Sequence, residues 1–177
     1  MKDCGKRREL EHLISAPEPY KRVSVVRLEM VREAVSLYGM GSFNKPQVAA
    51  EAVYPLVEKA DREMILAMSL DSQLVPIALE VIAVGAVDKC LLDMRTIFKH
   101  AILSNASYLI CFHNHPSGKA VPSREDRLMT AKIKMGGELL DIRLVDHIIL
   151  GSRGNFYSFC SEENLEGDAK EYYAIWS

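Results

Sequence analysis

Short apolar runs separated by polar turns cover most of the chain, which predicts an alternation of strands and helices. Residues 63–70 and 74–85 flank an Asp-Ser-Gln turn and predict two antiparallel strands. Because both runs are almost continuously apolar, we expect both strands to be buried on both faces. Further runs predict strands over residues 23–31, 108–112, 142–150 and 156–160.

Other segments have the length and composition of helices. These predicted helices cover residues 46–60, residues 94–105, and the stretch from Ser123 to about Met135. Asn44 is the expected cap of the first helix, and the pair Gly136-Gly137 is the expected end of the third. Pro55 lies inside the first helix, where proline removes a backbone donor. Helices interleave with strands, so the predicted fold class is α/β with a mixed sheet.

The length and composition of the chain indicate one domain. It has 177 residues, of which 49% are hydrophobic, enough to bury one ordinary core. We expect this domain to cover residues 22–160. Residues 1–21 are charged and end in a Pro-Glu-Pro turn, which predicts a loosely docked arm, and residues 161–177 are assigned to a C-terminal tail.

Charge and cysteine content argue against several classes of protein. The chain has 22 Lys and Arg against 24 Asp and Glu, a net charge of −2, so we expect DNA binding to be weak or absent. No apolar run approaches the roughly 20 residues of a membrane helix, and the N-terminus lacks the apolar segment of a signal peptide. The 4 cysteines form no CxxC pair, so we expect reduced thiols and a cytoplasmic protein.

The stretch HNHPSGKAVPSRED, residues 113–126, carries candidate metal ligands where a predicted strand ends. In an extended segment, residues i and i+2 point to the same side, so His113 and His115 can present their rings to one point while Asn114 faces away. Asp126 lies in the first turn of the next predicted helix and can direct its carboxylate to the same point. Two imidazoles and one carboxylate leave a fourth position for water, as in catalytic zinc sites.

A structural interpretation of the same residues stands beside this one. Ser123 is a good helix N-cap, and Asp126 at the third helical position can complete a capping box and interact favourably with the helix dipole. The histidine pair H-x-H is by itself a weak signal. All the positions taken together, at a strand end followed by a helix start, favour the metal site.

The spacing H-x-H-x7-S-x2-D, met by His113, His115, Ser123 and Asp126, resembles the signature of the JAB/MPN (JAMM) metalloenzymes. Within that superfamily, the wording of several segments is similar to that of the RadC-like proteins. These segments are HNHPSG, PSREDRLMT, LVDHIILG and DMRTIFKHAILSNA. The resemblance covers roughly residues 22–160.

The resemblance implies a cytidine-deaminase-like α/β/α sandwich in a single domain, and a zinc ion (Zn²⁺) held by His113, His115 and Asp126. It also implies a catalytic glutamate on an early strand, and Glu63 matches that place. In this interpretation zinc activates a water molecule, Glu63 takes the proton of that water, and Ser123 helps to hold the oxyanion.

Two classes of function follow from the resemblance. The first is a zinc hydrolase of peptide or isopeptide bonds, which acts on a peptide or protein substrate. The alternative is a DNA-repair or mobile-element-associated binding protein without hydrolytic activity. The complete ligand set with Glu63 favours the hydrolase, because a relic need not keep the base. Residues 1–45 also lack the helix-hairpin-helix module of larger RadC proteins, and pairing of exposed strands in a homodimer stays open.

The sequence leaves the roles of several neighbouring residues open. Arg95 keeps the arginine of the family, but Thr96 stands where an acidic residue usually follows it. Asn114 could bind substrate or tie down the loop. For Asp146 and His147 we expect a structural pair within a strand, and the alternative is that Asp146 accepts the N–H of a ligand imidazole.

Overall fold

The structure of the chain is a computed structural model that describes residues 26–27, 31, 41–85 and 93–163. The predicted arm 1–21, most of the predicted strand 23–31 and residues 164–177 of the predicted tail lie outside the described residues. Within the described ranges, no helix is long and apolar enough to cross a membrane.

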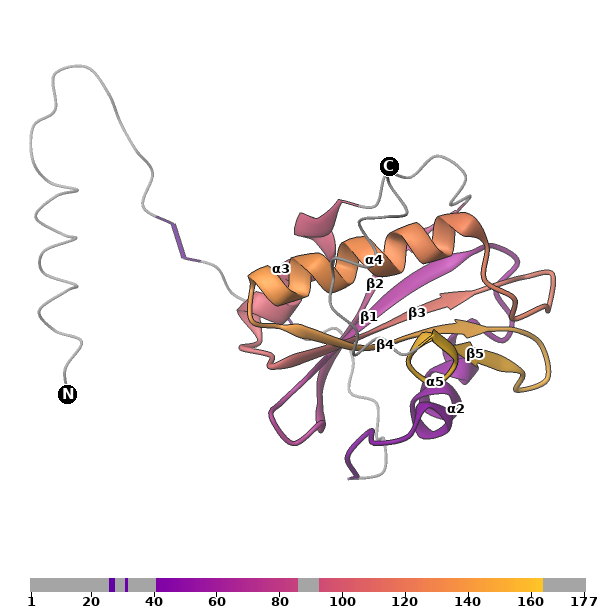
Figure 1. The fold of residues 1–177 in the computed structure, drawn as a ribbon, viewed down its shortest axis with the longest axis horizontal. Helices are drawn as coiled ribbons and strands as arrows, with labels where there is room; N and C mark the ends of the chain where they lie inside the picture. Colours follow the sequence, from indigo (N-terminus) through magenta and orange to yellow (C-terminus); the bar gives the residue numbers. More distant parts are fainter. Residues whose placement is uncertain (1–25, 28–30, 32–40, 86–92, 164–177) are drawn as a thin grey trace, which may run out of the picture.

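A five-stranded mixed sheet forms the centre of the fold (Figure 1). Its strands are β1 (Met64–Leu70), β2 (Pro76–Val84), β3 (Tyr108–Asn114), β4 (Arg143–Leu150) and β5 (Phe156–Ser158). Their order across the sheet is β2-β1-β3-β4-β5. β3 and β4 are parallel, and the other neighbouring strands are antiparallel. The predicted α/β class with a mixed sheet is therefore confirmed.

Helices cover both faces of this sheet and give the domain three layers (Figure 1). They are α2 (Pro46–Val57), α3 (Met94–Leu103), α4 (Arg124–Leu139) and the short α5 (Phe159–Glu163). α3 and α4 lie on one side of the sheet and α2 lies on the other. This is the single α/β/α domain that the resemblance implies.

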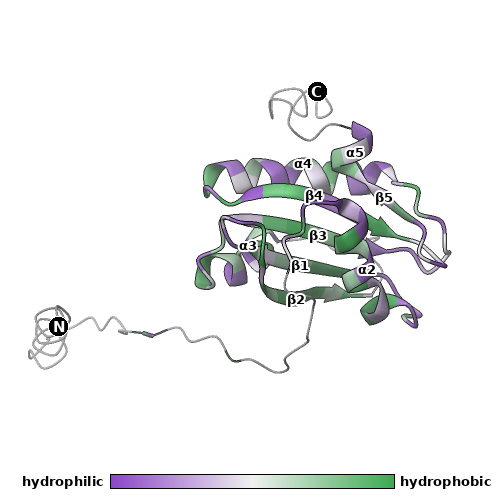
Figure 2. Ribbon diagram, turned by 90° about the horizontal axis from the view of Figure 1, so that it is seen from below, coloured by the Kyte–Doolittle hydropathy of each residue, from purple (hydrophilic) through white to green (hydrophobic). Residues whose placement is uncertain are grey.

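Side chains of β1 alternate between two hydrophobic cores. Ile65 and Ala67 belong to the core beneath α3 and α4, whereas Leu66 and Met68 belong to the core beneath α2. β1 and β3 are predominantly hydrophobic in Figure 2, as strands covered on both faces must be. The expected burial of the strand predicted over 63–70 is therefore confirmed.

The same expectation is wrong for β2, the strand predicted over 74–85. Ile77, Val81 and Val84 are exposed, and the rest of the strand is only half-buried. β2 lies at the edge of the sheet, where α3 packs against it, while α2 lies over β4 and β5. An apolar run alone does not distinguish a central strand from an edge strand, because the burial of each face of a strand depends on where the helices pack.

α2 begins at Pro46, as predicted, but its N-cap residue is not the expected one. Lys45, not Asn44, is the N-cap residue, and it makes no side-chain capping hydrogen bond. Pro46 occupies the first helical position and holds Lys45 in an extended conformation, so the proline fixes where the helix starts. Pro55 lacks the backbone N–H that would donate to the residue four positions earlier, and α2 ends two residues after it, at Val57, three residues before the predicted end.

α4 continues through the glycine pair that was expected to end it. A Cβ atom on Gly137 would lie 2.4 Å from the carbonyl oxygen of Ile142, and one on Gly136 would lie 2.9 Å from the ring of Phe98. These glycines therefore let α4 pack closely against Phe98 and Ile142, and they are not its cap. The chain turns instead at Asp141, which has a φ of 56°.

The last predicted strand, 156–160, is shorter than expected. β5 ends at Ser158, and Phe159 and Cys160 already belong to α5. The carboxylate of Asp146 accepts hydrogen bonds from the Ser158 hydroxyl (2.6 Å) and from the Cys160 backbone N–H (2.9 Å). This buried acceptor satisfies donors at the start of the helix, so the chain leaves the sheet at that point.

Candidate metal centre

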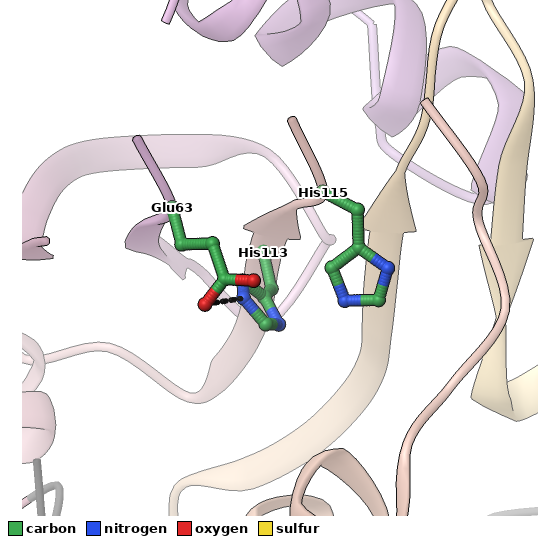
Figure 3. Close-up of side chains that lie close together, drawn as sticks. All are labelled: Glu63, His113 and His115. Atoms are coloured by element: carbon green, nitrogen blue, oxygen red, sulfur yellow. Dashed lines mark ion pairs between the residues drawn. The ribbon is translucent and has the colours of Figure 1, made fainter. Parts of the chain in front are cut away.

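Every predicted site residue lies near one end of β1 and β3. Glu63 directly precedes β1. His113 is the penultimate residue of β3, and His115 directly follows that strand. The antiparallel register pairs Ile65 with His113, which places Glu63 beside the histidines. In Figure 3 the Glu63 carboxylate points toward the His113 ring, and the His115 ring lies next to it. Ser123 and Asp126 lie at the start of α4, and the Asp126 carboxylate faces both histidine rings.

His113 lies between two carboxylates. Its side chain is 2% exposed, with Nδ1 2.9 Å from Asp126 Oδ1 and Nε2 3.8 Å from Glu63 Oε2. Neither ring nitrogen makes a well-aligned hydrogen bond, although buried polar atoms are normally satisfied. A cation held between the ring and the carboxylates would satisfy a nitrogen that the protein leaves without a partner.

His115 is oriented by its own loop. Its Nδ1 lies 2.9 Å from the carbonyl oxygen of Lys119, and because a carbonyl only accepts, Nδ1 carries the proton. The lone pair is then on Nε2, which lies 3.6 Å from Asp126 Oδ2. A ligand histidine that donates its other N–H to a carbonyl is the usual arrangement at metal sites.

The loop that holds His115 is in turn packed against the loop after β4. Gly118 has a φ of 78°, a conformation that favours glycine, and its carbonyl accepts from the Ser152 N–H at 3.0 Å. The backbone N–H of His115 donates to Leu150 O at 2.9 Å, which continues the β3–β4 ladder beyond the strand. These contacts hold the backbone of His115 in place at the end of the sheet.

Asp126 takes part in both interpretations that the sequence left open. Ser123 and Asp126 form a capping box: the Ser123 side chain accepts from the Asp126 N–H, and the Asp126 carboxylate accepts from the Ser123 N–H. The same carboxylate faces both histidines. Burial alone would raise the pKa of Asp126, but the His113 and His115 rings and Ser123 outweigh it and hold the pKa well below its usual range.

Ser123 makes its hydrogen bonds to Asp126. Its hydroxyl donates to Asp126 Oδ2 at 2.6 Å and accepts from the Asp126 N–H at 3.1 Å. The serine therefore holds the carboxylate in place at the start of α4. Its predicted contact with an oxyanion remains a prediction.

Donors of the type that zinc prefers are gathered at this point. Glu63, His113 and His115 each offer one ligand atom, and these atoms lie within 4.8 Å of one another. The carboxylate of Asp126 is adjacent to both rings. Imidazole nitrogen and carboxylate oxygen are common zinc ligands, so this cluster can hold a divalent metal ion. The predicted ligand set was His113, His115 and Asp126, and the structure adds Glu63 to the same cluster.

Behind the cluster, Asp146 and His147 have structural contacts. His147 is fully buried, its ring stacks on Phe159 at 5.0 Å, and burial lowers its pKa to about 3. Its Nδ1 lies 2.6 Å from Thr130 Oγ1, which itself donates to the Asp126 carbonyl at 2.7 Å. Asp146 bonds to the α5 junction, not to a ligand imidazole.

Thr130 was not singled out from the sequence. Its position four residues after Asp126 is the only local signal, and many helical threonines have that spacing. Arg95 lies outside this cluster of contacts: its exposed guanidinium pairs with Asp93, the N-cap of α3, at 2.6 Å. The structure therefore gives Arg95 a capping contact and no bond to the cluster.

The protein is thus an α/β/α domain with a candidate metal site at one end of its central strands. Two imidazoles and two carboxylates form this site. The RadC-like JAB domain family matches the chain over residues 43–165, and the chain belongs to this family.

Relatives come from bacteria and archaea. A UPF0758 protein of Thermotoga maritima is 44% identical over 105 residues, covering 59% of this chain and 47% of its own length. A UPF0758 protein of Actinobacillus pleuropneumoniae is 37% identical over 122 residues (69% and 55%), and one of Methanosarcina acetivorans is 35% identical over 117 residues (66% and 51%). The chain thus spans about half the length of the curated relatives that it matches.

Proposed function

We propose that the protein is a zinc-dependent metallohydrolase that cleaves peptide or isopeptide bonds. The observation that carries the proposal is the convergence of the Glu63 carboxylate, two histidine rings and the Asp126 carboxylate at one end of the sheet. The substrate class follows the resemblance to the JAB/MPN metalloenzymes. The proposed location is the reducing cytoplasm, because the 4 cysteines of the sequence form no CxxC pair and no disulfide framework.

His113, His115 and Asp126 would hold the zinc ion. When bound, zinc lowers the pKa of a coordinated water toward neutrality and polarises the carbonyl group that is attacked. The low pKa of Asp126 keeps this ligand ionised, and the Lys119 carbonyl keeps the Nε2 lone pair of His115 available.

Glu63 would be the general base. Its side chain is 35% exposed, so water and substrate can reach the carboxylate, whereas His113 beside it is buried. In the proposed reaction Glu63 takes a proton from the attacking water and returns it to the leaving amine. Both transfers need a carboxylate that stays at one place while the bond breaks.

Ser123 would stabilise the oxyanion that develops on the attacked carbonyl group. In the structure its hydroxyl proton is donated to Asp126 Oδ2, so this role requires the hydroxyl to turn toward the substrate. Two hydrogen bonds of the capping box do not use the hydroxyl proton: the Ser123 N–H donates to Asp126 Oδ2, and the Asp126 N–H donates to Ser123 Oγ.

The test compares wild type with Glu63→Gln, which keeps the size of the side chain and removes the base. Glu58→Gln, at the exposed glutamate that is the C-cap residue of α2, is the matched control. Zinc-loaded proteins are incubated with pools of quenched linear peptides and of peptides joined through a lysine side chain. We expect cleavage by wild type and Glu58→Gln, and a loss of roughly 10²-fold or more in Glu63→Gln at equal zinc content.

Wild-type rates in Glu63→Gln would show that the base lies elsewhere. Failure of the zinc-loaded wild type to cleave either pool would favour the non-catalytic binding role instead.

A further inference from the structure

The side chain of Asn114 binds the backbone on both sides of Glu63. The Met64 N–H donates to Asn114 Oδ1 at 2.6 Å, and Asn114 Nδ2 donates to the Arg62 carbonyl at 3.1 Å. One primary amide thus supplies an acceptor to the residue after Glu63 and a donor to the residue before it. We call this pair of bonds the Asn114 bracket.

The register of β1 and β3 explains why an amide fits here. The last backbone pair of the ladder joins Ile65 to His113. One step further along, Met64 comes opposite Asn114, but there the side-chain amide takes the place of a main-chain peptide group. Because an amide has the same donor and acceptor as a peptide unit, it continues the antiparallel ladder over Glu63.

The other side of this segment is held by β2. The Glu63 carbonyl accepts from the Gly85 N–H at 2.9 Å. Glu63 itself lies outside regular structure, between a bend and the first residue of β1. The Asn114 bracket and the Gly85 bond therefore hold the backbone of Glu63 from two sides.

Asn114 is badly placed to bind a substrate. Its residue surface is 4% exposed, and the oxygen and the nitrogen of its amide are each bonded to backbone. Of the two roles that the sequence left open, the contacts favour the tie to the chain. The tie is not to its own loop, however, but to a segment 50 residues earlier.

We propose that Asn114 is a positioning residue that sets the carboxylate of Glu63 beside His113. With the bracket in place, Glu63 Oε2 lies 3.8 Å from His113 Nε2. Without it, the Met64 N–H and the Arg62 carbonyl lose their partner, and the segment that carries Glu63 is held from one side only. That Glu63 thereby acts as a base rests on the proposed function, whereas the bracket does not.

The experiment uses isotope-labelled protein in the presence of one equivalent of zinc and compares wild type with Asn114→Ala and Asn114→Asp. Gln73→Ala is the control, because it removes an exposed amide in the β1–β2 turn at the other end of the sheet. The readouts are the hydrogen exchange of the Met64 amide, the carbonyl carbon resonance of Arg62, and the nuclear Overhauser effect between the Glu63 side chain and the His113 ring.

In Asn114→Ala we expect the Met64 amide to exchange roughly tenfold faster or more, the scale of one lost hydrogen bond, and the contact between Glu63 and His113 to disappear. The control should match wild type in both. Asn114→Asp keeps the acceptor for Met64 and loses the donor to Arg62, so Met64 should stay protected while the Arg62 carbonyl resonance shifts.

Unchanged Met64 exchange with a retained Glu63–His113 contact in Asn114→Ala would overturn the proposal. If that variant does not fold, Asn114→Asp decides alone, and an unchanged Arg62 resonance would overturn it. The proposed function fails independently, through wild-type hydrolysis by Glu63→Gln, a variant that leaves the bracket intact.

Discussion

At the residue scale, the Asp126 carboxylate links the helix to the candidate metal centre. Oδ1 faces His113, and Oδ2 accepts from Ser123 and faces His115. The structural and the metal-binding interpretations of this residue are therefore compatible. The hydrogen bonds of the capping box hold the carboxylate in the orientation in which it faces both histidine rings. A buried carboxylate with several donors remains ionised, as a zinc ligand must.

Asp146 gives a pH-dependent prediction at the same scale. Burial raises its pKa from 3.8 to about 6, although the Ser158 hydroxyl and the Cys160 N–H act in the opposite direction. The ionised form is thus disfavoured in the folded protein, and the folded state loses stability as pH rises from about 4 through about 6. Above pH 6 the full cost is reached, about 3 kcal/mol for a shift of this size.

Asp146→Asn cannot ionise, so its free energy of unfolding relative to wild type should increase by about 2 kcal/mol between pH 4.5 and pH 7.5, since about 1 kcal/mol of the full cost is already present at pH 4.5. Urea denaturation of both proteins at each pH measures the difference, in which groups common to both cancel. His147 stays neutral over this range because burial lowers its pKa to about 3. A difference that does not vary with pH would contradict the raised pKa.

The site residues could be proposed from the sequence because most of them lie in one short stretch with fixed spacing. Glu63 needed the family resemblance, since nothing local links it to residues 113–126. The contacts of Asn114 and Thr130 were out of reach. Asn114 depends on which backbone groups the β1–β3 register brings opposite it, and Thr130 depends on how α4 packs against β4.

At the element scale, apolar periodicity located each strand and helix of the described body apart from α5, and the errors are at boundaries. Local signals for helix ends and strand ends were overruled by tertiary packing. Gly136 and Gly137 were expected to end the helix, yet they lie inside α4 and allow it to approach Phe98 of α3 and Ile142 closely. Phe159 continues an apolar run that predicted a strand, yet it begins α5, where the Cys160 N–H donates to the Asp146 carboxylate.

Gly137 supplies the element-scale prediction. Alanine has a higher helix propensity than glycine, but its Cβ would lie 2.4 Å from the carbonyl oxygen of Ile142, a backbone atom that cannot easily move. Gly137→Ala should therefore destabilise the fold by about 1–3 kcal/mol, the scale of overpacking.

Gly41→Ala is the control, because no heavy atom of the described residues, apart from its chain neighbours, lies within 4 Å of its Cβ position, and it should change stability by less than about 0.5 kcal/mol. Thermal and urea denaturation of both variants checks the pair. A Gly137→Ala protein more stable than wild type would mean that helix propensity, and not the contact with Ile142, decides at this position.

At the scale of the whole molecule, the alternation of strands and helices predicted the α/β class with a mixed sheet, and the family resemblance implied the three layers. The alternation did not predict which strand lies at the edge, because the runs that became β1 and β2 are equally apolar. Substrate and partners are still less accessible from the pattern, since they depend on the surface around the site. The net charge of −2 bears on one of them, nucleic acid.

We expect binding to duplex DNA to be weak and governed by salt, because the net charge of the chain is −2. Fluorescence anisotropy with labelled duplexes at low and physiological salt measures it, and any affinity should fade at the higher salt. Nanomolar, sequence-selective binding at physiological salt would instead favour the DNA-associated alternative.

The zinc content of the protein shows whether His113 and His115 form a metal site. Wild type, the double variant His113→Ala/His115→Ala, and His100→Ala, which removes a buried histidine of α3 outside the cluster, are dialysed against limiting zinc and analysed by mass spectrometry for bound metal. We expect one zinc ion per chain in wild type and in His100→Ala, and loss of stoichiometric zinc in the double variant, because both imidazole ligands are gone. One tightly bound zinc ion retained in the double variant would contradict this metal site.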